Sequence, residues 1–540
     1  MLSGAESLQG NAGLIIRAMP KGKRKRSANS QPLQNMVVIV LLTLAVLIVL
    51  GQANPLTTRL GRDSGMYTYV ASHLVRGDTP YVSAWEHKPP GIFFIDALGL
   101  SLTGGSRWGI WLVEFVSLTL AAMIGFRALK KHFGAAPALV ASFVWLGGLG
   151  LVLEGGNFTE EFSLPFAFAS LLLFGLTLDR PASAWLCAGL GLAAGCTFML
   201  RPNNAGVQIA IVFTELALVL RGERAWRETL LGWAALAAGF AIPLAAAVVY
   251  FLSRGALAQF FEAAILFNLA YGGRSDLFGA VAGGIKHLGF AAGLGLAGLV
   301  VAFSELLRQF RTKSLDPVLL WLGIAAVLEA VLSGLSGRNY PHYFILWLPW
   351  IAFGSALLFT RLAPQFNAWY GRFAVPVVLV AIAALSAASL GTLGTYALSV
   401  RELAVAGGAA QRQDQLSSYI NDRTVPGETV YVWGGEAGIN FLSRRDAPTA
   451  HFSYAQLGPS PQTERLSREF YEDIAAHPPA LILDMAGDEL PTLATENPVQ
   501  WLVSRGLYAT PYLQEFFDFV HANYSYSTSV AGVPVYALER

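Results

Sequence analysis

The stretch MVVIVLLTLAVLIVL, residues 36–50, contains no charged side chain, and it decides the fold. A helix of about 20 apolar residues crosses the ~30 Å hydrocarbon core of a membrane, and comparable stretches recur to about residue 397. Hydrophobic residues make up 54% of the 540-residue chain and charged residues only 13%, whereas a soluble protein has roughly 25% charged residues. The membrane is therefore the predicted solvent for most of the chain.

The polar residues 1–34 include the basic run KGKRKR at 21–26. We predict that they form a disordered tail on the cytoplasmic side. A basic tail before an apolar segment also fits a secretory signal peptide, with small residues at 51–53 for cleavage. We favour an uncleaved first span, and the topology of the following chain is the same in both cases.

The charge of the loops alternates along the chain. With the tail inside, the loops on its side should carry Lys and Arg, and each of them does, as at Lys130 and Lys131. The opposite loops, above all residues 53–105, are long and rich in acids and aromatics, and such loops usually carry the chemistry of a scaffold. We predict about eleven spans, at residues 35–52, 106–128, 135–154, 162–179, 183–200, 204–220, 229–252, 286–304, 317–335, 342–360 and 373–397.

After residue 400 the composition becomes that of a soluble domain. Short β-rich runs alternate there with amphipathic helical stretches, which predicts a small α/β domain over 401–540. An odd number of spans places this domain outside the cytoplasm. The predicted fold is therefore an all-α polytopic membrane bundle over 35–400 with an extracytoplasmic α/β domain. The β-rich runs lie at 429–433, 480–484 and 533–538, and the helical stretches near 411–421, 462–476 and 510–521.

The first outer loop contains three polar motifs, GRDSGMY at 61–67, RGDTPY at 76–81 and WEHKPPG at 85–91. Between the first two, the stretch from Tyr67 to Leu74 has apolar residues at helical spacing. This pattern favours a short helix in the membrane interface with its Tyr rings at headgroup level, which would hold Asp63 just outside the hydrocarbon. A cap or turn residue is the alternative for an isolated Asp.

The order of these motifs after the first span resembles the bacterial GT-C glycosyltransferases of the dolichyl-phosphate-mannose protein mannosyltransferase type. That group includes the lipid A aminoarabinose and lipopolysaccharide-core sugar transferases, and the resemblance covers about residues 35–400. It implies that Asp63 is the general base acting on the acceptor, with Tyr67 in support. Many relatives carry Glu after this Asp, where this chain has Ser64, so a second acidic contact at this point is not expected.

The resemblance also implies a cationic cradle for a lipid phosphate. Lys88 of the His87-Lys88-Pro-Pro block is the first candidate, and snorkelling of Lys88 to water is the alternative. The last outer loop, GRNYPHY at 337–343, resembles a block in which Arg338 clamps phosphate and His342 donates a hydrogen bond, with Tyr340 in support. A lipid-headgroup anchor is the alternative for Arg338. Arg201 is a further candidate of the same kind.

The second outer loop, EGGNFTEE at 154–161, has three acids at the lip of two spans. Relatives carry an acidic residue here that orients the acceptor or a metal ion, and Glu160 matches best, with Glu161 next. A divalent cation is the one cofactor that the resemblance allows. The alternative is that Thr159 caps the following helix and the acids favour its first turn.

The net charge of +2 is too small to indicate nucleic-acid binding. The sequence has no phosphate-binding Gly loop and no dinucleotide fingerprint, which argues against a sugar-nucleotide donor. We therefore predict an inverting transferase in the cytoplasmic membrane that moves one sugar from a polyprenyl-phosphate donor to a lipid, glycan or protein acceptor, with the outer α/β domain as an acceptor-side lid or docking module. A lipid-linked oligosaccharide ligase or polymerase, and a non-enzymatic lipid-linked sugar flippase, are the alternatives.

Overall fold

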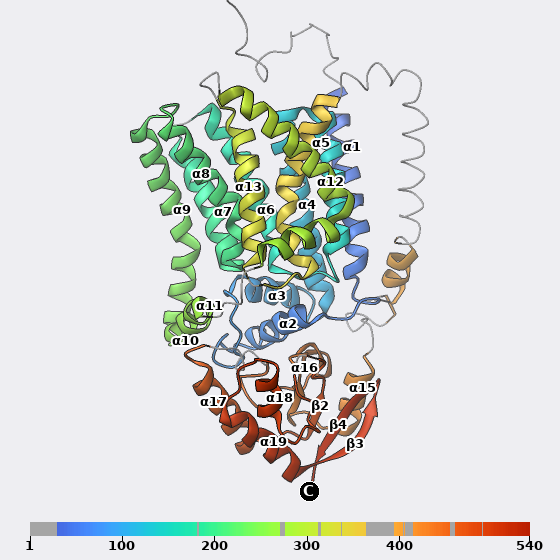
Figure 1. Cartoon of the computed structure of the whole chain (residues 1–540). Helices are drawn as coiled ribbons and strands as arrows, with labels where there is room; N and C mark the ends of the chain where they lie inside the picture. Colours follow the sequence, from blue (N-terminus) through green and yellow to red (C-terminus); the bar gives the residue numbers. More distant parts are fainter. Residues whose placement is uncertain are drawn as a thin grey trace, which may run out of the picture.

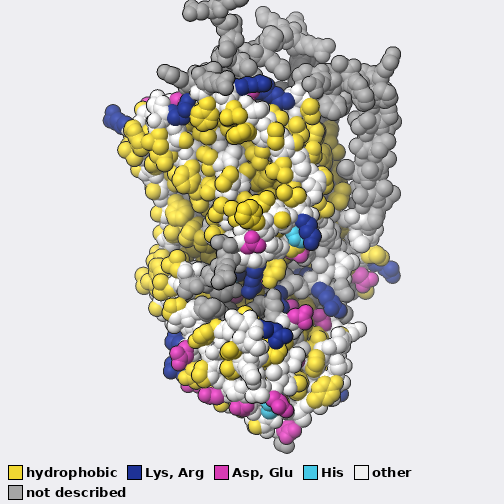
Figure 2. Space-filling model, in the orientation of Figure 1, with side chains coloured by type: hydrophobic (Ala, Val, Ile, Leu, Met, Phe, Trp, Pro, Cys, Tyr) yellow, Lys and Arg dark blue, Asp and Glu magenta, His cyan; other side chains and the backbone are white. Residues whose placement is uncertain are grey.

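A long helical bundle and a smaller domain with a β-sheet make up the computed structural model, with two short helices between them (Figure 1). The structure describes residues 30–539, except 181–182, 271–275, 311–314, 336, 363–391, 393, 403, 406–413, 454–459 and 489. Hydrophobic side chains cover the bundle, and charged side chains gather at its far edge and in the band next to the sheet domain (Figure 2). This distribution is the one expected of a protein whose bundle lies in a membrane.

Within the described residues, nine helical stretches are long and apolar enough to cross a membrane. A further apolar helix, α7 (Ala184–Leu200), has 17 residues and packs between α6 and α9. Ten of the eleven predicted spans are therefore helical, while most of 373–397 lies outside the described residues. The nine are Asn35–Ala53 (α1, Ser30–Val49, and η1, Leu50–Ala53), α4 (Arg107–Phe133), α5 (Ala135–Val152), α6 (Thr159–Asp179), Pro202–Leu220 (η2, Pro202–Ala205, and α8, Gly206–Leu220), α9 (Trp226–Ser253), α12 (Leu277–Phe310), α13 (Pro317–Gly334) and Pro341–Leu362, which begins with η4 (Pro341–Trp347).

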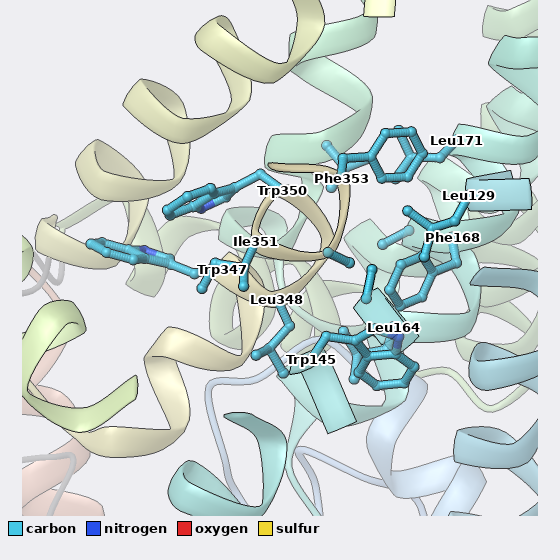
Figure 3. Close-up of a cluster of buried hydrophobic side chains, with 14 of the residues drawn as sticks. Leu129, Trp145, Leu164, Phe168, Leu171, Trp347, Leu348, Trp350, Ile351 and Phe353 are labelled. Atoms are coloured by element: carbon cyan, nitrogen blue, oxygen red, sulfur yellow. The ribbon is translucent and has the colours of Figure 1, made fainter. Parts of the chain in front are cut away.

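The core of the bundle lies where α5, α6 and the helix of 341–362 meet (Figure 3). The ring of Trp145 packs on that of Phe168, with centroids 5.0 Å apart. Gly148 lets α5 approach Leu348, because a Cβ on that glycine would lie 2.9 Å from the Leu348 side chain. This packing fixes the helix ends that carry the second and the last outer loops.

Two helices of the first outer loop, α2 (Arg62–Val75) and α3 (Gly91–Leu102), lie between the bundle and the sheet domain (Figure 1). The helix expected at 67–74 is thus present, but its Tyr rings are covered by protein instead of being open to lipid headgroups. Tyr67 and Tyr69 are both buried. The Tyr69 ring packs on Phe452, and its hydroxyl accepts a hydrogen bond from the Ala447 amide over 2.9 Å. The sheet domain therefore covers the face that the sequence suggested would meet lipid.

The C-terminal sheet has the strand order β1-β2-β4-β3, with β1 and β2 parallel and the other pairs antiparallel. The three predicted strands are present, and β3, whose side chains are mostly exposed and polar, is an additional one. The strands are β1 (Val430–Trp433), β2 (Leu481–Asp484), β3 (Tyr524–Val530) and β4 (Val533–Leu538), and the helices are α15 (Gln415–Arg423), α16 (Gly438–Ser443), α17 (Thr463–Ala476), α18 (Pro498–Ser504) and α19 (Pro511–Asn523). Between α9 and α12 lie α10 (Leu257–Phe261), η3 (Glu262–Phe267) and α11 (Asn268–Ala270).

Candidate active site

Asp63 is the second residue of α2, and its side chain is 31% exposed. A carboxylate in the first turn of a helix is stabilised by the unpaired backbone N–H groups and the positive end of the helix dipole. Its Oδ2 atom lies 3.8 Å from Nε2 of His342, which comes from the last outer loop. The first and last outer loops, nearly 280 residues apart in the sequence, therefore meet at this carboxylate.

The His-Lys-Pro-Pro block forms a compact group of charges with the preceding Glu86, which is only 1% exposed. The Glu86 carboxylate accepts a hydrogen bond from the Lys88 amide over 2.6 Å, and its Oε1 lies 3.0 Å from His87 Nδ1 and 4.0 Å from Lys88 Nζ. Burial alone would raise the pKa of Glu86, but His87 and Lys88 lower it to about 2. Glu86 is therefore a buried anion that holds this cationic segment in place.

Lys88 points toward the helix that carries Asp63. Its Nζ lies 3.2 Å from His87 Nε2 and 5.9 Å from the centre of the Tyr67 ring. Burial opposes the charge of Lys88, but Glu86 and Asp63 outweigh burial and raise the pKa of its ammonium group. At neutral pH Lys88 is consequently a fixed cation with little access to water, as a phosphate cradle requires.

Tyr67 lies at the centre of the cluster. Burial raises the pKa of its phenol well above the usual value, and the negative charges of Asp63 and Glu86 add to this effect. Glu160 raises the pKa further, whereas Arg201 lowers it. The Tyr67 hydroxyl is therefore a neutral hydrogen-bond donor within electrostatic range of both acids and cations.

Glu160 and Arg201 form a partly buried ion pair at the ends of α6 and α7 that face the sheet domain. Arg201 also lies over the ring of Tyr343, 4.5 Å from its centre. Burial lowers the pKa of Arg201, but the neighbouring Glu160 more than compensates and raises it. Since a guanidinium has five N–H donors and Glu160 does not occupy them all, Arg201 can still bind a further anion.

His342 is held between two aromatic rings, those of Phe158 at 4.2 Å and Tyr340 at 5.8 Å, both nearly parallel to it. Its Nδ1 lies 3.0 Å from the Glu154 carboxylate. Its buried Nε2 has no hydrogen-bond partner among the described residues, although it faces Asp63. A buried polar atom without a partner is costly, and a substrate group between His342 and Asp63 would satisfy it.

Two predicted site residues lie elsewhere. Arg338 is exposed and lies against Tyr340, with its Nη1 3.5 Å from the Tyr340 hydroxyl. Glu161 points into a buried network with Glu114, where both carboxylates accept hydrogen bonds from the backbone N–H of Asn157. The structure thus separates the neighbours Glu160 and Glu161, because successive helical residues point to different faces.

The buried network continues to Asp96 of α3, whose Oδ2 accepts a hydrogen bond from the Asn157 side chain over 2.8 Å. Burial raises the pKa of Asp96 to about 8. A cavity of about 20 Å³, lined in part by Ser64, Thr68 and Glu114, adjoins it. This space, the size of one water molecule, links the second outer loop to the underside of the helix that carries Asp63.

No three His, Cys, Asp or Glu side chains of the described residues have the geometry to hold a metal ion. The site instead has a partly open carboxylate, an ammonium and a guanidinium group, and an oriented imidazole. Such a set can remove a proton from an incoming nucleophile and stabilise a departing phosphate.

Several residues of this cluster were not among the sequence candidates, namely Glu86, Glu154, Tyr343 and Glu436 of the sheet domain. Glu86 adjoins the predicted Lys88, and Glu154 belongs to the acidic loop already singled out, so position in a motif could have identified both. No sequence signal pointed to Glu436, because it reaches the site through the packing of a separate domain.

Comparisons with known proteins bear on the fold and on the family. Residues 87–259 match the family model of dolichyl-phosphate-mannose-protein mannosyltransferases. The crystal structure of apo ArnT from Cupriavidus metallidurans is similar with a TM-score of 0.57 and 16% identity, covering 94% of this chain and 98% of that chain. The structure of the same protein bound to undecaprenyl phosphate has a TM-score of 0.58 and 16% identity, covering 93% and 98%.

No curated protein matches the sequence of this chain. The structural likeness nevertheless extends over nearly the whole length of both chains, including the sheet domain. The chain therefore has the fold of these ArnT structures, and its residues 87–259 match the family model of dolichyl-phosphate-mannose-protein mannosyltransferases, which confirms the resemblance predicted from the sequence.

Proposed function

We propose that this chain is an inverting glycosyltransferase that moves one sugar from a polyprenyl-phosphate carrier to a lipid, glycan or protein acceptor at the outer face of the cytoplasmic membrane. One observation carries the proposal. Asp63, Lys88, Glu160, Arg201 and His342, from four separate segments, gather at one end of the bundle.

In the proposed reaction Asp63 accepts the proton of the acceptor hydroxyl or amine. The acceptor atom then forms a bond to the anomeric carbon from the side opposite the phosphate, and the bond from that carbon to the phosphate oxygen breaks. A single displacement of this kind inverts the configuration. One carboxylate suffices because the lipid phosphate is a good leaving group, unlike the alkoxide in hydrolytic glycosidases, which need a second carboxyl group as acid.

Lys88 and Arg201 would neutralise the departing phosphate. Both cations are largely shielded from water, with 13% and 18% of their side chains exposed, and acids maintain their charge, Glu86 for Lys88 and Glu160 for Arg201. Fixed cations in a site with little water stabilise developing charge more than mobile ones do, because no solvent has to reorganise. Arg338, exposed beside Tyr340, would serve at most the outer edge of this cradle.

A lipid-linked donor agrees with the position of the site, because α2, which carries Asp63, lies at the end of the apolar bundle (Figure 1). The cationic loops, including Lys130 and Lys131 at the end of α4, favour a cytoplasmic location for the opposite end by the positive-inside rule. The structural neighbour that binds undecaprenyl phosphate supports a polyprenyl-phosphate carrier.

The first test identifies the donor by mass spectrometry of the lipid that copurifies with the protein, and then supplies that labelled lipid to membranes. Asp63→Asn should retain the donor and lose transfer by about 10³-fold, at the scale of an essential base. Asp78→Asn, in the same loop but paired with His73, is the matched control and should behave like the wild type.

The product also separates the rival functions. The transferase proposed here adds one sugar, whereas a ligase or polymerase would add a chain. A flippase would move the labelled lipid between leaflets without making product and would tolerate Asp63→Asn. Either result would refute the proposal.

A further inference from the structure

The sheet domain reaches the helix of Asp63 through the loop that follows β1. After Trp433 the chain turns at Gly434 and Gly435, with φ values of 123° and 78°, and α16 begins at Gly438. Positive φ values of this size favour glycine. A Cβ on Gly434 would also collide with the backbone after β2. We call residues 434–438 the β1 loop.

The β1 loop packs directly on α2. A Cβ added to Gly65 would lie 2.9 Å from the backbone nitrogen of Gly438, so the two backbones are in contact without a side chain between them. Farther along α2, the Arg76 guanidinium pairs with Asp446 over 2.9 Å. The sheet domain therefore holds α2 from its first turn to its last, and the β1 loop has little freedom relative to Asp63.

Glu436 of the β1 loop extends to the first turn of α2. Its Oε1 lies 3.5 Å from Nε of Arg62, the residue before Asp63. Burial raises the pKa of Glu436, Arg62 opposes this effect, and the negative charge of Asp63 adds to it, so the two carboxylates are within electrostatic range. The Arg62 guanidinium offsets part of the repulsion between these two carboxylates.

Glu436, Arg62 and Asp63 are similarly accessible, with side chains 27%, 32% and 31% exposed. The buried cations that would hold the phosphate are far less so, as Lys88 is only 13% exposed. The carboxylates of Asp63 and Glu436 are therefore both accessible to a polar acceptor from water.

We propose that Glu436 is a specificity-determining residue, whose carboxylate accepts a hydrogen bond from a second hydroxyl of a saccharide acceptor while Asp63 takes the proton of the first. The inference rests on the proposed function and assigns its acceptor class. Two carboxylates on neighbouring elements match the paired hydroxyls of a sugar, whereas a simple alcohol offers one donor. The saccharide could be a soluble glycan or the headgroup of a lipid.

The test uses the full chain in proteoliposomes with its labelled donor, and compares soluble oligosaccharides, lipid-linked saccharides and a hydroxyl-bearing peptide as acceptors. Glu436→Gln should raise the KM for the saccharide about tenfold, the scale of one hydrogen bond to a charged group, with kcat within about threefold and donor KM unchanged. Glu472→Gln, an exposed acid on α17, is the matched control and should match the wild type.

Saccharide acceptors that each lack one hydroxyl test whether Glu436 contacts the acceptor directly or only stabilises the structure around it. With the wild type, one of these acceptors should have a raised KM. Glu436→Gln should not raise the KM of that acceptor further, because both changes remove the same hydrogen bond. The charge swap Arg62→Glu with Glu436→Arg restores an ion pair without a carboxylate at 436, and should keep the raised KM.

Each failure is distinguishable. If the wild-type chain transfers no sugar to any acceptor, the proposed function itself is wrong. If it transfers sugar but Glu436→Gln leaves the acceptor KM unchanged, or the charge swap restores it, the role of Glu436 is refuted while the function stands. Transfer to the peptide alone would refute the saccharide class, and use of the soluble or the lipid-linked sugar identifies the source.

Discussion

The candidate site has two halves that differ in their access to water. In the half that we call buried, Tyr67 and Glu86 lie within the protein, and His87 and Lys88 are only 15% and 13% exposed. The Lys88 ammonium group lies 4.0 Å from the Glu86 carboxylate. The open half, Arg62, Asp63 and Glu436, is about one-third exposed and combines parts of two domains. A leaving phosphate is best stabilised by fixed charges away from water, whereas an acceptor has to enter and leave. The difference indicates which substrate each half serves.

Removal of the Lys88 cation from the buried half should reduce the transfer activity most. Lys88→Gln leaves Glu86 as a buried anion without its ammonium partner, and removes one charge from the phosphate cradle. We expect activity about 10³-fold lower, measured as transfer of labelled sugar at saturating acceptor. Lys130→Gln, at the opposite end of the bundle, should retain wild-type activity. Retention of activity by Lys88→Gln would show that the buried half does not bind the phosphate.

The Glu86 carboxylate in the buried half should make the stability of the folded protein depend on pH. Because the folded pKa of Glu86 is about 2, below its ordinary value of 4.5, its contribution is present above about pH 4.5 and is lost as the pH falls toward 2. A shift of this size corresponds to on the order of 3 kcal/mol. In acid melting curves in detergent, Glu86→Gln should lose this pH dependence and transfer sugar about tenfold more slowly. An unchanged acid profile would contradict an ionised Glu86.

A second buried carboxylate, Asp96, should change the stability with pH in the direction opposite to Glu86. Asp96, beneath the open half, has a pKa raised to about 8 from 3.8, so the folded protein retains a proton that the unfolded chain releases. Stability should therefore fall as the pH rises from about 4 to 8. Asp96→Asn keeps a neutral acceptor for Asn157 and removes this loss, so its melting temperature should exceed that of the wild type increasingly toward pH 8. A constant difference would refute a neutral Asp96.

The smallest effect on activity is expected from a substitution outside both halves of the site. Arg338 is exposed beside Tyr340, and exposed charges contribute little because water and salt screen them. Arg338→Gln should change kcat/KM for the lipid donor by less than about threefold, measured beside Arg201→Gln, which should lose at least a hundredfold. Equal losses of kcat/KM in the two variants would show that Arg338 belongs to the phosphate cradle.

Local sequence patterns were sufficient for much of the architecture. The predicted spans at 106–128, 135–154 and 317–335 correspond to α4, α5 and α13, because a long apolar run in a membrane has to satisfy its backbone hydrogen bonds as a helix. The three predicted strands of the sheet domain followed from β-rich runs between turn residues. Strand β3 did not, since its polar side chains lie on an exposed face.

For the site, residue type and motif position indicated the candidates Asp63, Lys88 and His342, but not their partners. The burial of Tyr67 and Tyr69 was missed because the local pattern of α2 is that of an interfacial helix, and only the docked sheet domain turns it into an interior one.

The sequence by itself determined that this is a membrane bundle with its polar motifs in loops between the spans, because hydropathy and loop charge depend on residues that are near in the chain. Only the tertiary structure decided that Glu160 pairs with Arg201 while Glu161 turns away, and that Glu436 pairs with Arg62, the residue before Asp63. Those relations join segments up to about 370 residues apart, and helix packing and domain docking, rather than any local pattern, bring them together.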